Sequence, residues 1–266
     1  MKQNNWTNLL DIAISAAIRA GEEILHIYQS GDFSIEIKDD NSPVTKADKL
    51  SSKVIVAELA KTNIPVLSEE EKEIDFETRK HWSELWIVDP LDGTKEFIKK
   101  NGEFAINIGL VKNKKPFLGV IYIPVSGEIF YGSKETGSFK CSKNEYLAKG
   151  IKSDYKQLPY HKNTNEYVVT GSRSHSSEET QNFFEKLKKK HTNSNFKKIG
   201  SSVKFCRLAE GKVDIYPRFQ YCMEWDTAAG HAIINGVGGK IETSKGIELK
   251  YGKKDFKNTN FIAKIF

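Results

Sequence analysis

The stretch WIVDPLDGTKEF, from Trp86 to Phe97, carries two aspartates directly after a run of apolar residues. The apolar run is typical of a fully buried strand, and the proline and glycine that follow indicate a tight turn. Two carboxylates at the end of a buried strand are costly unless a positive charge lies between them. Because Pro90 would fix this turn, we expect Asp89 and Asp92 to lie close together and to bind a cation.

The residues after Asp92 predict a second function for the same turn. The letters GTKEF would begin a short helix, with the backbone N–H groups of Gly93 and Thr94 free to hold a phosphate. Glycine permits the close approach of a phosphate oxygen, and the Thr94 hydroxyl can hydrogen-bond a water held by a metal. A turn that does no more than cap a helix would have the same composition, and this alternative stays open.

Further acidic residues stand where regular elements begin or end, which is where binding groups are usually carried. They are Asp48, the triplet from Glu69 to Glu71, and Asp226. Taken singly, Asp48 and Asp226 would suit helix N-caps and the triplet would suit a solvated surface. If they converge on the first two aspartates, the all-oxygen ligand set selects Mg²⁺, Mn²⁺ or Ca²⁺ over zinc.

Length and composition predict a soluble protein with a sizeable core. The chain has 266 residues, of which 38% are hydrophobic and 11% aromatic. We find no run of about 18 apolar residues and no signal-peptide pattern at the N-terminus, so a cytoplasmic protein is expected. The 3 cysteines are widely spaced, which indicates reduced thiols rather than a disulfide framework.

The charge is mildly basic, at +6 from 41 Lys and Arg against 35 Asp and Glu. The lysine runs are scattered and are typical of solvated faces, and neither a basic strand with interleaved aromatic residues nor a recognition helix indicates nucleic-acid binding. A phosphorylated small substrate would also suit a basic surface.

Apolar spacing predicts helices at about residues 6–29 and 47–61, and an antiparallel meander at about residues 104–131. Residues of about 140–165 are polar and weakly patterned, so we expect a linker or insertion there. The second half predicts a strand in EYVVTG, a helix capped by Ser176 or Ser177, a helix closed by Gly211, a strand in KVDIYPRF and a helix in WDTAAGHAIINGVGG. This grouping favours a layered α/β or α+β architecture.

WIVDPLDGT resembles the first signature of the lithium-sensitive, Mg²⁺-dependent inositol monophosphatase superfamily, and WDTAAGHAII resembles the second. SPVTKAD and VLSEEE fall where that superfamily has its other acidic segments, and the resemblance extends to about Ile241. It implies a sugar-phosphatase fold with alternating α-β-α-β-α layers, an antiparallel-rich sheet in the N-terminal half and a smaller sheet in the C-terminal half. It also implies one catalytic unit, residues 1–266, with subdomains of about 1–140 and 165–266.

DPLDGTKEFIKKNGEFAINIGLV is most similar to the bacterial 3′(2′),5′-bisphosphate nucleotidases of the CysQ type, as is VVTGSRSHSS. This resemblance implies removal of the 3′-phosphate from adenosine 3′,5′-bisphosphate, a by-product of sulfate activation, to give AMP. An inositol monophosphatase or another sugar-phosphate phosphatase of the superfamily remains the alternative. The chain departs from the branch in QYCME, where Glu224 is an unexpected carboxylate beside Trp225.

The resemblance implies two or three Mg²⁺ ions and in-line attack by a metal-activated water. Glu69 and Thr94 would orient the water, and Asp48 would accept a hydrogen bond from Thr94 or support a third metal. The implied metal ligands are Glu69, Asp89, the carbonyl of Leu91, Asp92 and Asp226.

The expected substrate is a small nucleotide bisphosphate, and Lys204 and Arg218 are expected to bind its 5′-phosphate. Ordinary surface charge is the alternative for these two residues. A monomer and a homodimer both stay open, and the basic charge would suit peripheral contact with the inner face of the cell membrane. The expected substrate-binding residues are Leu91, Asp92, Gly93, Thr94, Ser172, Arg173, Ser174, His175, Lys204, Arg218 and Asp226.

Overall fold

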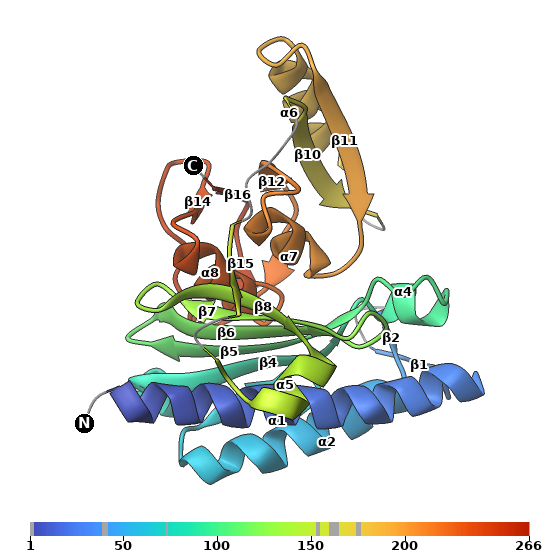
Figure 1. The fold of residues 1–266 in the computed structure, drawn as a ribbon, viewed down its shortest axis with the longest axis vertical. Coiled ribbons are helices and arrows are strands. Elements are labelled where there is room, and N and C mark those ends of the chain that lie inside the picture. Colours follow the sequence, from blue (N-terminus) through green and yellow to red (C-terminus); the bar gives the residue numbers. More distant parts are fainter. Residues whose placement is uncertain are drawn as a thin grey trace.

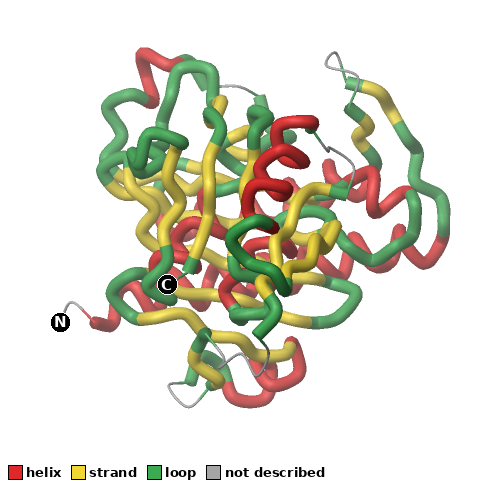
Figure 2. Tube along the Cα trace, turned by 90° about the horizontal axis from the view of Figure 1, so that it is seen from above, coloured by secondary structure: helices red, strands yellow, loops and turns green. Residues whose placement is uncertain are grey.

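The computed structural model describes residues 3–38, 42–72, 74–152, 155–159, 165–173 and 177–265. Helices and sheets alternate in layers, which confirms the expected fold class (Figure 1). Loops lie mostly around the edge of the molecule, while most strands lie toward its middle (Figure 2). Among the described residues, no helix is both long enough and apolar enough to cross a membrane.

The larger sheet contains the predicted meander and extends it on both sides. Within the described ranges it has 7 strands in the order β3-β4-β5-β6-β7-β8-β9. Only the β3–β4 pair is parallel, and the other pairs are antiparallel. The strands are β3 (Val66–Ser68), β4 (Glu84–Asp92), β5 (Ala105–Lys112), β6 (Lys115–Ile123), β7 (Glu128–Ser133), β8 (Gly137–Ser142) and β9 (Lys156–Gln157).

One face of the larger sheet is covered by α1 (Gln3–Ser30) and α2 (Lys46–Leu59), which continues as the 3₁₀ turn η1 (Ala60–Thr62). Both helices lie close to their predicted positions. The α1 helix ends at Gly31, which has φ +76° and donates its N–H to the Ile27 carbonyl at 3.1 Å.

The other face of the larger sheet packs against α7 (Val203–Ala209) and α8 (Ala228–Gly236), which separate it from the smaller sheet. The outer layer is α6 (Glu178–Lys188), and Ser177 forms its N-cap. In the described ranges, the smaller sheet has 5 strands in the order β11-β10-β12-β16-β14. They are β10 (Tyr167–Ser172), β11 (Ser194–Ile199), β12 (Ile215–Arg218), β14 (Lys240–Thr243) and β16 (Phe261–Lys264).

Several short elements complete the described chain. Within residues 33–38 (FSIEIK), only Glu36 and Ile37 form a strand, β1. This strand is exposed, and its partner β2 is equally short. The other short pair joins β13 to β15 near the pocket described below. The short elements are β1 (Glu36–Ile37), β2 (Pro43–Val44), α3 (Phe76–Arg79), α4 (Thr94–Ile98), α5 (Lys143–Lys149), β13 (Cys222–Met223) and β15 (Lys257–Asn258).

The linker expected at about residues 140–165 is wrong as far as Gln157. Residues 143–149 form α5, and β9 pairs with β8, so this polar segment continues the larger sheet. A capping box between Ser142 and Glu145 begins the helix, and Tyr146 and Tyr155 anchor the segment in the core. Residues 153–154 and 160–164 lie outside the described residues.

Small residues let α8 lie directly on the larger sheet. A Cβ at Gly119 would lie 2.2 Å from the Ala229 carbonyl oxygen, and a Cβ at Gly109 would lie 2.8 Å from the Ala229 amide nitrogen. Glycine is therefore required at both positions of the sheet. This close approach brings Asp226, which lies two residues before the start of α8, toward the end of β4.

Candidate active site

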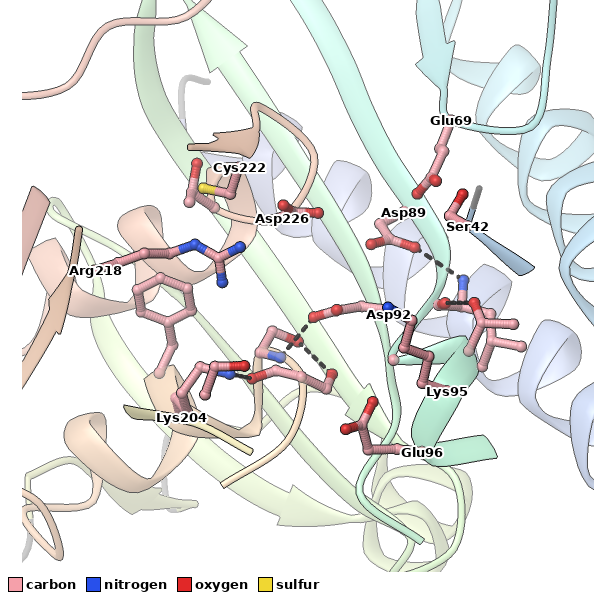
Figure 3. A pocket seen from close by; sticks show the side chains of 18 of the residues that line it. Ser42, Glu69, Asp89, Asp92, Lys95, Glu96, Lys204, Arg218, Cys222 and Asp226 are labelled. Atoms are coloured by element: carbon pink, nitrogen blue, oxygen red, sulfur yellow. Dashed lines mark hydrogen bonds between the residues drawn. The ribbon is translucent and has the colours of Figure 1, made fainter. Parts of the chain in front are cut away.

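Asp89 and Asp92 reach the same pocket because β4 is irregular between them. Residues three apart on a regular strand point to opposite faces of the sheet. Here Asp89 pairs with Asn107 and Asp92 with Ala105, and the register shifts between the two pairs. The Leu91 N–H donates to Asp89 Oδ1 at 3.1 Å, which holds this bulge. The predicted proximity of the two aspartates is therefore confirmed (Figure 3).

Two further carboxylates come from other elements. Strand β3 runs parallel to β4, and the N–H of Glu69 donates to the Val88 carbonyl at 3.1 Å, so Glu69 begins its loop beside Asp89. Asp226 is fixed by the Met223 N–H, which donates to its Oδ2 at 2.9 Å. One carboxylate oxygen from each of Asp89, Asp92 and Asp226 lies within 4.8 Å of the others, and Glu69 lines the same pocket.

This acid cluster, defined as Glu69, Asp89, Asp92 and Asp226, lacks enough positive charge of its own. Burial raises the pKa of Asp89 well above its usual range, and the neighbouring carboxylates raise it further. Burial also raises the pKa of Glu69 to about 8, although Lys38 opposes the shift. Burial and repulsion from Asp92 raise the pKa of Asp226 to about 6. A hard divalent cation would stabilise the charged forms, and Mg²⁺ fits this all-oxygen donor set.

Asp48 uses its two oxygens for two different tasks. Its Oδ2 accepts hydrogen bonds from the N–H and the hydroxyl of Thr45, both at 2.7 Å, as the N-terminal capping box of α2. Its Oδ1 accepts a hydrogen bond from the Thr94 hydroxyl at 3.0 Å, and burial raises its pKa to about 6. The N-cap of α2 is thus Thr45 and not Asp48, which stands at the third helical position of the capping box, while the expected bond to Thr94 is confirmed.

Gly93 stands at the start of α4 with φ +93°. A Cβ there would lie 3.1 Å from the Ser201 Cβ and 3.2 Å from the Glu103 carbonyl oxygen. Only glycine therefore fits without strain or displacement of its neighbours. Gly93, Thr94 and Leu91 all line the pocket, while the phosphate-binding role of the two amides stays a prediction.

Two cations form the opposite wall of the pocket (Figure 3). Lys204 is 3% exposed and donates from Nζ to the Ser201 carbonyl at 2.6 Å, and burial lowers its pKa to about 8. Arg218 is half-buried, and its Nε has no hydrogen-bond partner among the described residues. The alternative of ordinary surface charge is wrong for the buried Lys204, while Arg218 lines the same pocket and its role stays a prediction.

The expected substrate loop is only partly described. Ser172, at the end of β10, lines the pocket. Arg173 instead forms two 2.8 Å hydrogen bonds with Glu103. Ser174 and His175 lie outside the described residues, so their expected roles stay predictions.

Residues near the acid cluster that the sequence did not single out include Lys38, Asn107 and Ser202. Lys38 donates to Glu69 at 2.9 Å and also forms an ion pair with Glu70. Asn107 and Ser202 donate to Asp92 Oδ2. The polar Asn107 within an apolar strand was the available signal, because buried amides need hydrogen-bond partners.

The unexpected Glu224 does not line the pocket and instead binds the segment at Gly252 and Lys253. It is fully buried, and its carboxylate accepts hydrogen bonds from the backbone of Gly252 at 2.9 Å and of Lys253 at 3.0 Å. The Lys253 ammonium supplies a further bond at 2.9 Å. Of the departing QYCME stretch, Cys222 lines the pocket, as a buried free thiol.

The chain is similar to known proteins over almost its whole length. A sequence model of the inositol monophosphatase family matches residues 5–264. The chain is 40% identical over 266 residues to the 3′(2′),5′-bisphosphate nucleotidase CysQ of Buchnera aphidicola subsp. Acyrthosiphon pisum, covering 98% of this chain and 95% of that protein. It is 40% identical over 264 residues to CysQ of Escherichia coli strain K12, covering 97% and 100%.

The solved structures include CysQ from Bacteroides thetaiotaomicron, described as a bacterial member of the inositol monophosphatase family. It is 45% identical to this chain, has a TM-score of 0.86, and the match covers 97% of this chain and 96% of that one. The resemblance seen in the sequence motifs thus extends over nearly the whole chain. The chain belongs to the inositol monophosphatase family.

Proposed function

We propose that the chain is a Mg²⁺-dependent 3′(2′),5′-bisphosphate nucleotidase. It hydrolyses the 3′-phosphate of adenosine 3′,5′-bisphosphate, giving AMP and phosphate. The nucleotidases named above support this activity class, since they match along almost their whole length. One pocket contains both the acid cluster and the two cations Lys204 and Arg218. A ligand with two phosphates could place one phosphate at each of these two ends, which supports the choice of a bisphosphate.

The single observation that carries the proposal is the cationic wall opposite the acid cluster. A phosphate monoester needs only the metal end of such a pocket. Among the described residues, Asp226 is close enough to attract both Lys204 and Arg218, but neither cation forms an ion pair with a carboxylate. Their positive charge in the pocket wall supports a second anionic group on the ligand. The outer nitrogens of Arg218 make only long hydrogen bonds within the described residues, at 3.4 Å to the Tyr216 hydroxyl and 3.4 Å to the Tyr221 carbonyl, so they retain donors for a phosphate oxygen.

At the metal end, we assign Asp89, Asp92 and Asp226 to one Mg²⁺ site. Glu69, Asp89 and the Leu91 carbonyl form a second site, and a third, weaker site near Asp48 stays a prediction. When bound, Mg²⁺ supplies a Lewis acid for the phosphate and lowers the pKa of a coordinated water.

The chain's own groups orient the reactants. Glu69 and the Thr94 hydroxyl hold the attacking water, and Asp48 fixes the direction of that hydroxyl. The turn at Gly93 and Thr94 faces the phosphate to be removed. The Thr94 hydroxyl also lies 3.3 Å from the Leu91 carbonyl oxygen, so the water-orienting group and the expected carbonyl ligand are in contact.

Phosphate release with Mg²⁺ tests this proposal. We expect a higher kcat/KM for adenosine 3′,5′-bisphosphate than for inositol 1-phosphate. A preference for the inositol ester would support the alternative of an inositol monophosphatase. A cytoplasmic location, peripheral membrane contact, inhibition by Li⁺ and assembly as a monomer or homodimer remain predictions from the sequence and its resemblance.

A further inference from the structure

A polar contact at the rim of the pocket joins three segments of the chain. Glu103 Oε2 accepts hydrogen bonds from Arg173 Nε at 2.8 Å and from the Gly200 N–H at 2.7 Å. Glu103 Oε1 accepts a further bond from Arg173 Nη2 at 2.8 Å. We call Glu103, Arg173 and Gly200 the rim latch.

The rim latch connects the two halves of the protein beside the phosphate turn. Glu103 lies just before β5 of the larger sheet, while Arg173 and Gly200 follow β10 and β11 of the smaller sheet. The fit is tight, because a Cβ at Gly200 would lie 2.8 Å from the Glu96 Cγ and 3.0 Å from the Glu103 Cβ. Arg173 also donates to the carbonyl of Lys198 at 2.9 Å, which ties the latch to the end of β11.

The turn from Gly200 to Ser202, which the rim latch holds, is hydrogen-bonded to the predicted metal ligand Asp92. Two residues after Gly200, the Ser202 N–H donates to Asp92 Oδ2 at 2.5 Å. Asn107 Nδ2 donates to the same oxygen at 3.3 Å, and its own Oδ1 accepts from the Ser202 hydroxyl at 2.6 Å. Two donors thus hold Oδ2 and leave Oδ1 as the oxygen available to a cation.

The residue between these two anchors is held in an unusual conformation. Ser201 has φ +54°, in the left-handed region, which non-glycine residues occupy only when the surroundings fix them. The turn from Gly200 to Ser202 is therefore fastened at one end by Glu103 and at the other by Asp92. Loss of the first fastening would let the turn relax and carry the Ser202 amide away from Asp92.

We propose that Glu103 is a positioning residue, which together with Arg173 fixes the turn from Gly200 to Ser202 and so orients the Asp92 carboxylate toward the metal. Arg173 then acts through Glu103, and not as a direct ligand of the substrate. The inference deepens the proposed function and rests on its assignment of Asp92 as a Mg²⁺ ligand.

A second ion pair provides a matched control. Glu128 on β7 and Arg207 on α7 also join the two halves, with Arg207 Nη2 2.7 Å from Glu128 Oε2. Among the described residues, the carboxylate of Glu128 bonds only to Ser126, Lys140 and Arg207, none of which belongs to the acid cluster. If Glu103 were only a structural bridge, substitution of Glu103 and substitution of Glu128 would have the same effect on Mg²⁺ binding. If Glu103 is a positioning residue, only its substitution would weaken Mg²⁺ binding.

The test is calorimetric titration of substrate-free protein with Mg²⁺, for wild type, Glu103→Ala and Glu128→Ala. Removing a group that orients a metal ligand weakens metal binding about 10- to 100-fold, and we expect a rise in the Mg²⁺ dissociation constant of about 10-fold for Glu103→Ala. We expect Glu128→Ala to lower the melting temperature and to leave the Mg²⁺ dissociation constant within about 2-fold of wild type. Equal Mg²⁺ affinity in Glu103→Ala and Glu128→Ala would overturn the proposal.

Two more variants keep the test decisive if Glu103→Ala folds poorly. Glu103→Gln retains an acceptor for the Gly200 N–H and should bind Mg²⁺ more tightly than the charge swap Glu103→Arg with Arg173→Glu. The swap restores an ion pair but offers no acceptor to Gly200, so weak Mg²⁺ binding by the swapped protein supports the proposal. Wild-type Mg²⁺ affinity in the swapped protein contradicts it.

The same measurements distinguish a failure of the proposed substrate from a failure of the proposed role of Glu103. If wild type binds Mg²⁺ but does not hydrolyse adenosine 3′,5′-bisphosphate, the proposed substrate is wrong. The difference in Mg²⁺ affinity between Glu103→Ala and Glu128→Ala still tests the role of the rim latch. If wild type hydrolyses that substrate and the two variants bind Mg²⁺ alike, the latch alone is wrong.

Discussion

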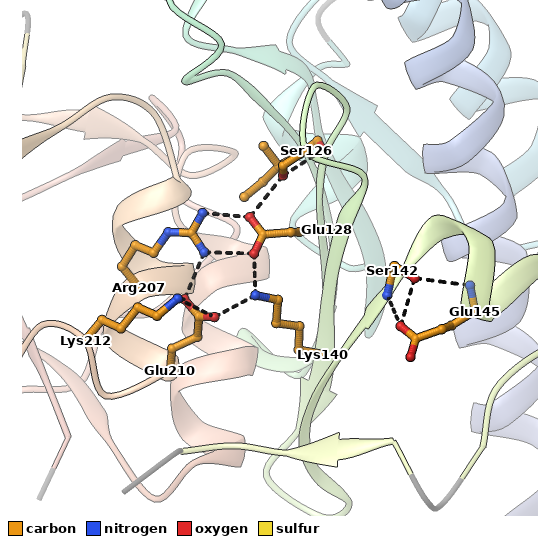
Figure 4. A network of polar contacts seen from close by, with 9 residues as sticks. Ser126, Glu128, Lys140, Ser142, Glu145, Arg207, Glu210 and Lys212 are labelled. Carbon is orange, nitrogen blue, oxygen red and sulfur yellow. Dashed lines mark hydrogen bonds and ion pairs between the residues drawn. The ribbon is translucent and has the colours of Figure 1, made fainter. Parts of the chain in front are cut away.

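Two groups of charged side chains, each only partly buried, differ in how their charges are matched. The acid cluster brings four carboxylates together, with the single lysine Lys38 bonded to Glu69 at its edge. The second group, which we call the balanced network, joins β7 and β8 to α7 (Figure 4). It consists of Glu128, Glu210, Lys140, Arg207 and Lys212.

The difference in charge balance has opposite effects on the carboxyl groups. Burial opposes the charge of Glu128, yet the hydrogen bonds from Arg207 and Lys140 lower its pKa to about 2. Burial without such partners raises the pKa of Asp89. Similar side chains thus serve stability where their charges are matched inside the protein, and ligand binding where they are not.

The largest expected effect is that of Asp92→Asn, which should lower kcat on the order of 100-fold or more because a ligand that would hold Mg²⁺ against the reacting phosphate is lost. Mg²⁺ binding should weaken too, while the melting temperature without Mg²⁺ should not fall, since one of several repelling charges is removed. Phosphate release and thermal melts in chelator measure these effects, with the exposed Asp255→Asn as the control. Near-normal turnover would refute the assignment of Asp92 as a ligand.

Arg218→Ala tests the cationic wall of the same pocket. Hydrogen bonds to charged groups contribute about 1.5–3 kcal/mol, so the KM for adenosine 3′,5′-bisphosphate should rise about 10- to 100-fold. The KM for a nucleoside 3′-monophosphate should change much less. An equal rise for both substrates would remove the assignment of Arg218 to the second phosphate.

Removal of Mg²⁺ should lower the stability of the folded chain. A ligand at about 100 times its dissociation constant stabilises by about 2.7 kcal/mol, which corresponds to a rise in melting temperature of about 5–10 °C for a chain of this size. Melting curves in chelator and in excess Mg²⁺ measure the shift. Glu128→Gln should retain this shift and Asp89→Asn should reduce it, and the reverse order would contradict the division between the two groups.

The smallest expected effect is on acid stability. The folded-state pKa of Glu128 lies near 2, below its ordinary value of 4.5, so the unfolded chain binds more protons between these values. The stabilisation from Glu128 is therefore present above about pH 4.5 and is lost as the pH falls toward about 2. Denaturant melts should show a shallower loss over this interval for Glu128→Gln than for wild type. The exposed Glu185→Gln should follow wild type, and parallel curves for all three proteins would refute the strong pairing.

The sequence predicted the acid cluster well because its members stand in local patterns. Asp89 and Asp92 follow a buried strand, and Asp226 precedes a helix, so spacing and resemblance were enough to group them. The sequence predicted a tight turn at Pro90, whereas β4 continues to Asp92 with a bulge whose form depends on pairing with β5.

Contacts between distant segments could not be predicted in the same way. The pairing of Arg173 with Glu103 depends on how the two halves meet, and the resemblance had implied a substrate contact for Arg173. The role of Glu224 could not be predicted, because the amides of Gly252 and Lys253 that donate to it lie 28 and 29 residues away in the sequence. The segment expected to be a linker joined the larger sheet through the buried Tyr146 and Tyr155, two anchors in a polar stretch too short to show periodicity.

The most direct test of the central claim compares adenosine 3′,5′-bisphosphate with adenosine 3′-monophosphate in the presence of Mg²⁺. These substrates share the phosphate to be removed and differ only in the phosphate that would meet Lys204 and Arg218. A pocket with two opposite charged ends predicts a kcat/KM about 10- to 100-fold higher for the bisphosphate. Equal kcat/KM values for the two substrates would contradict it.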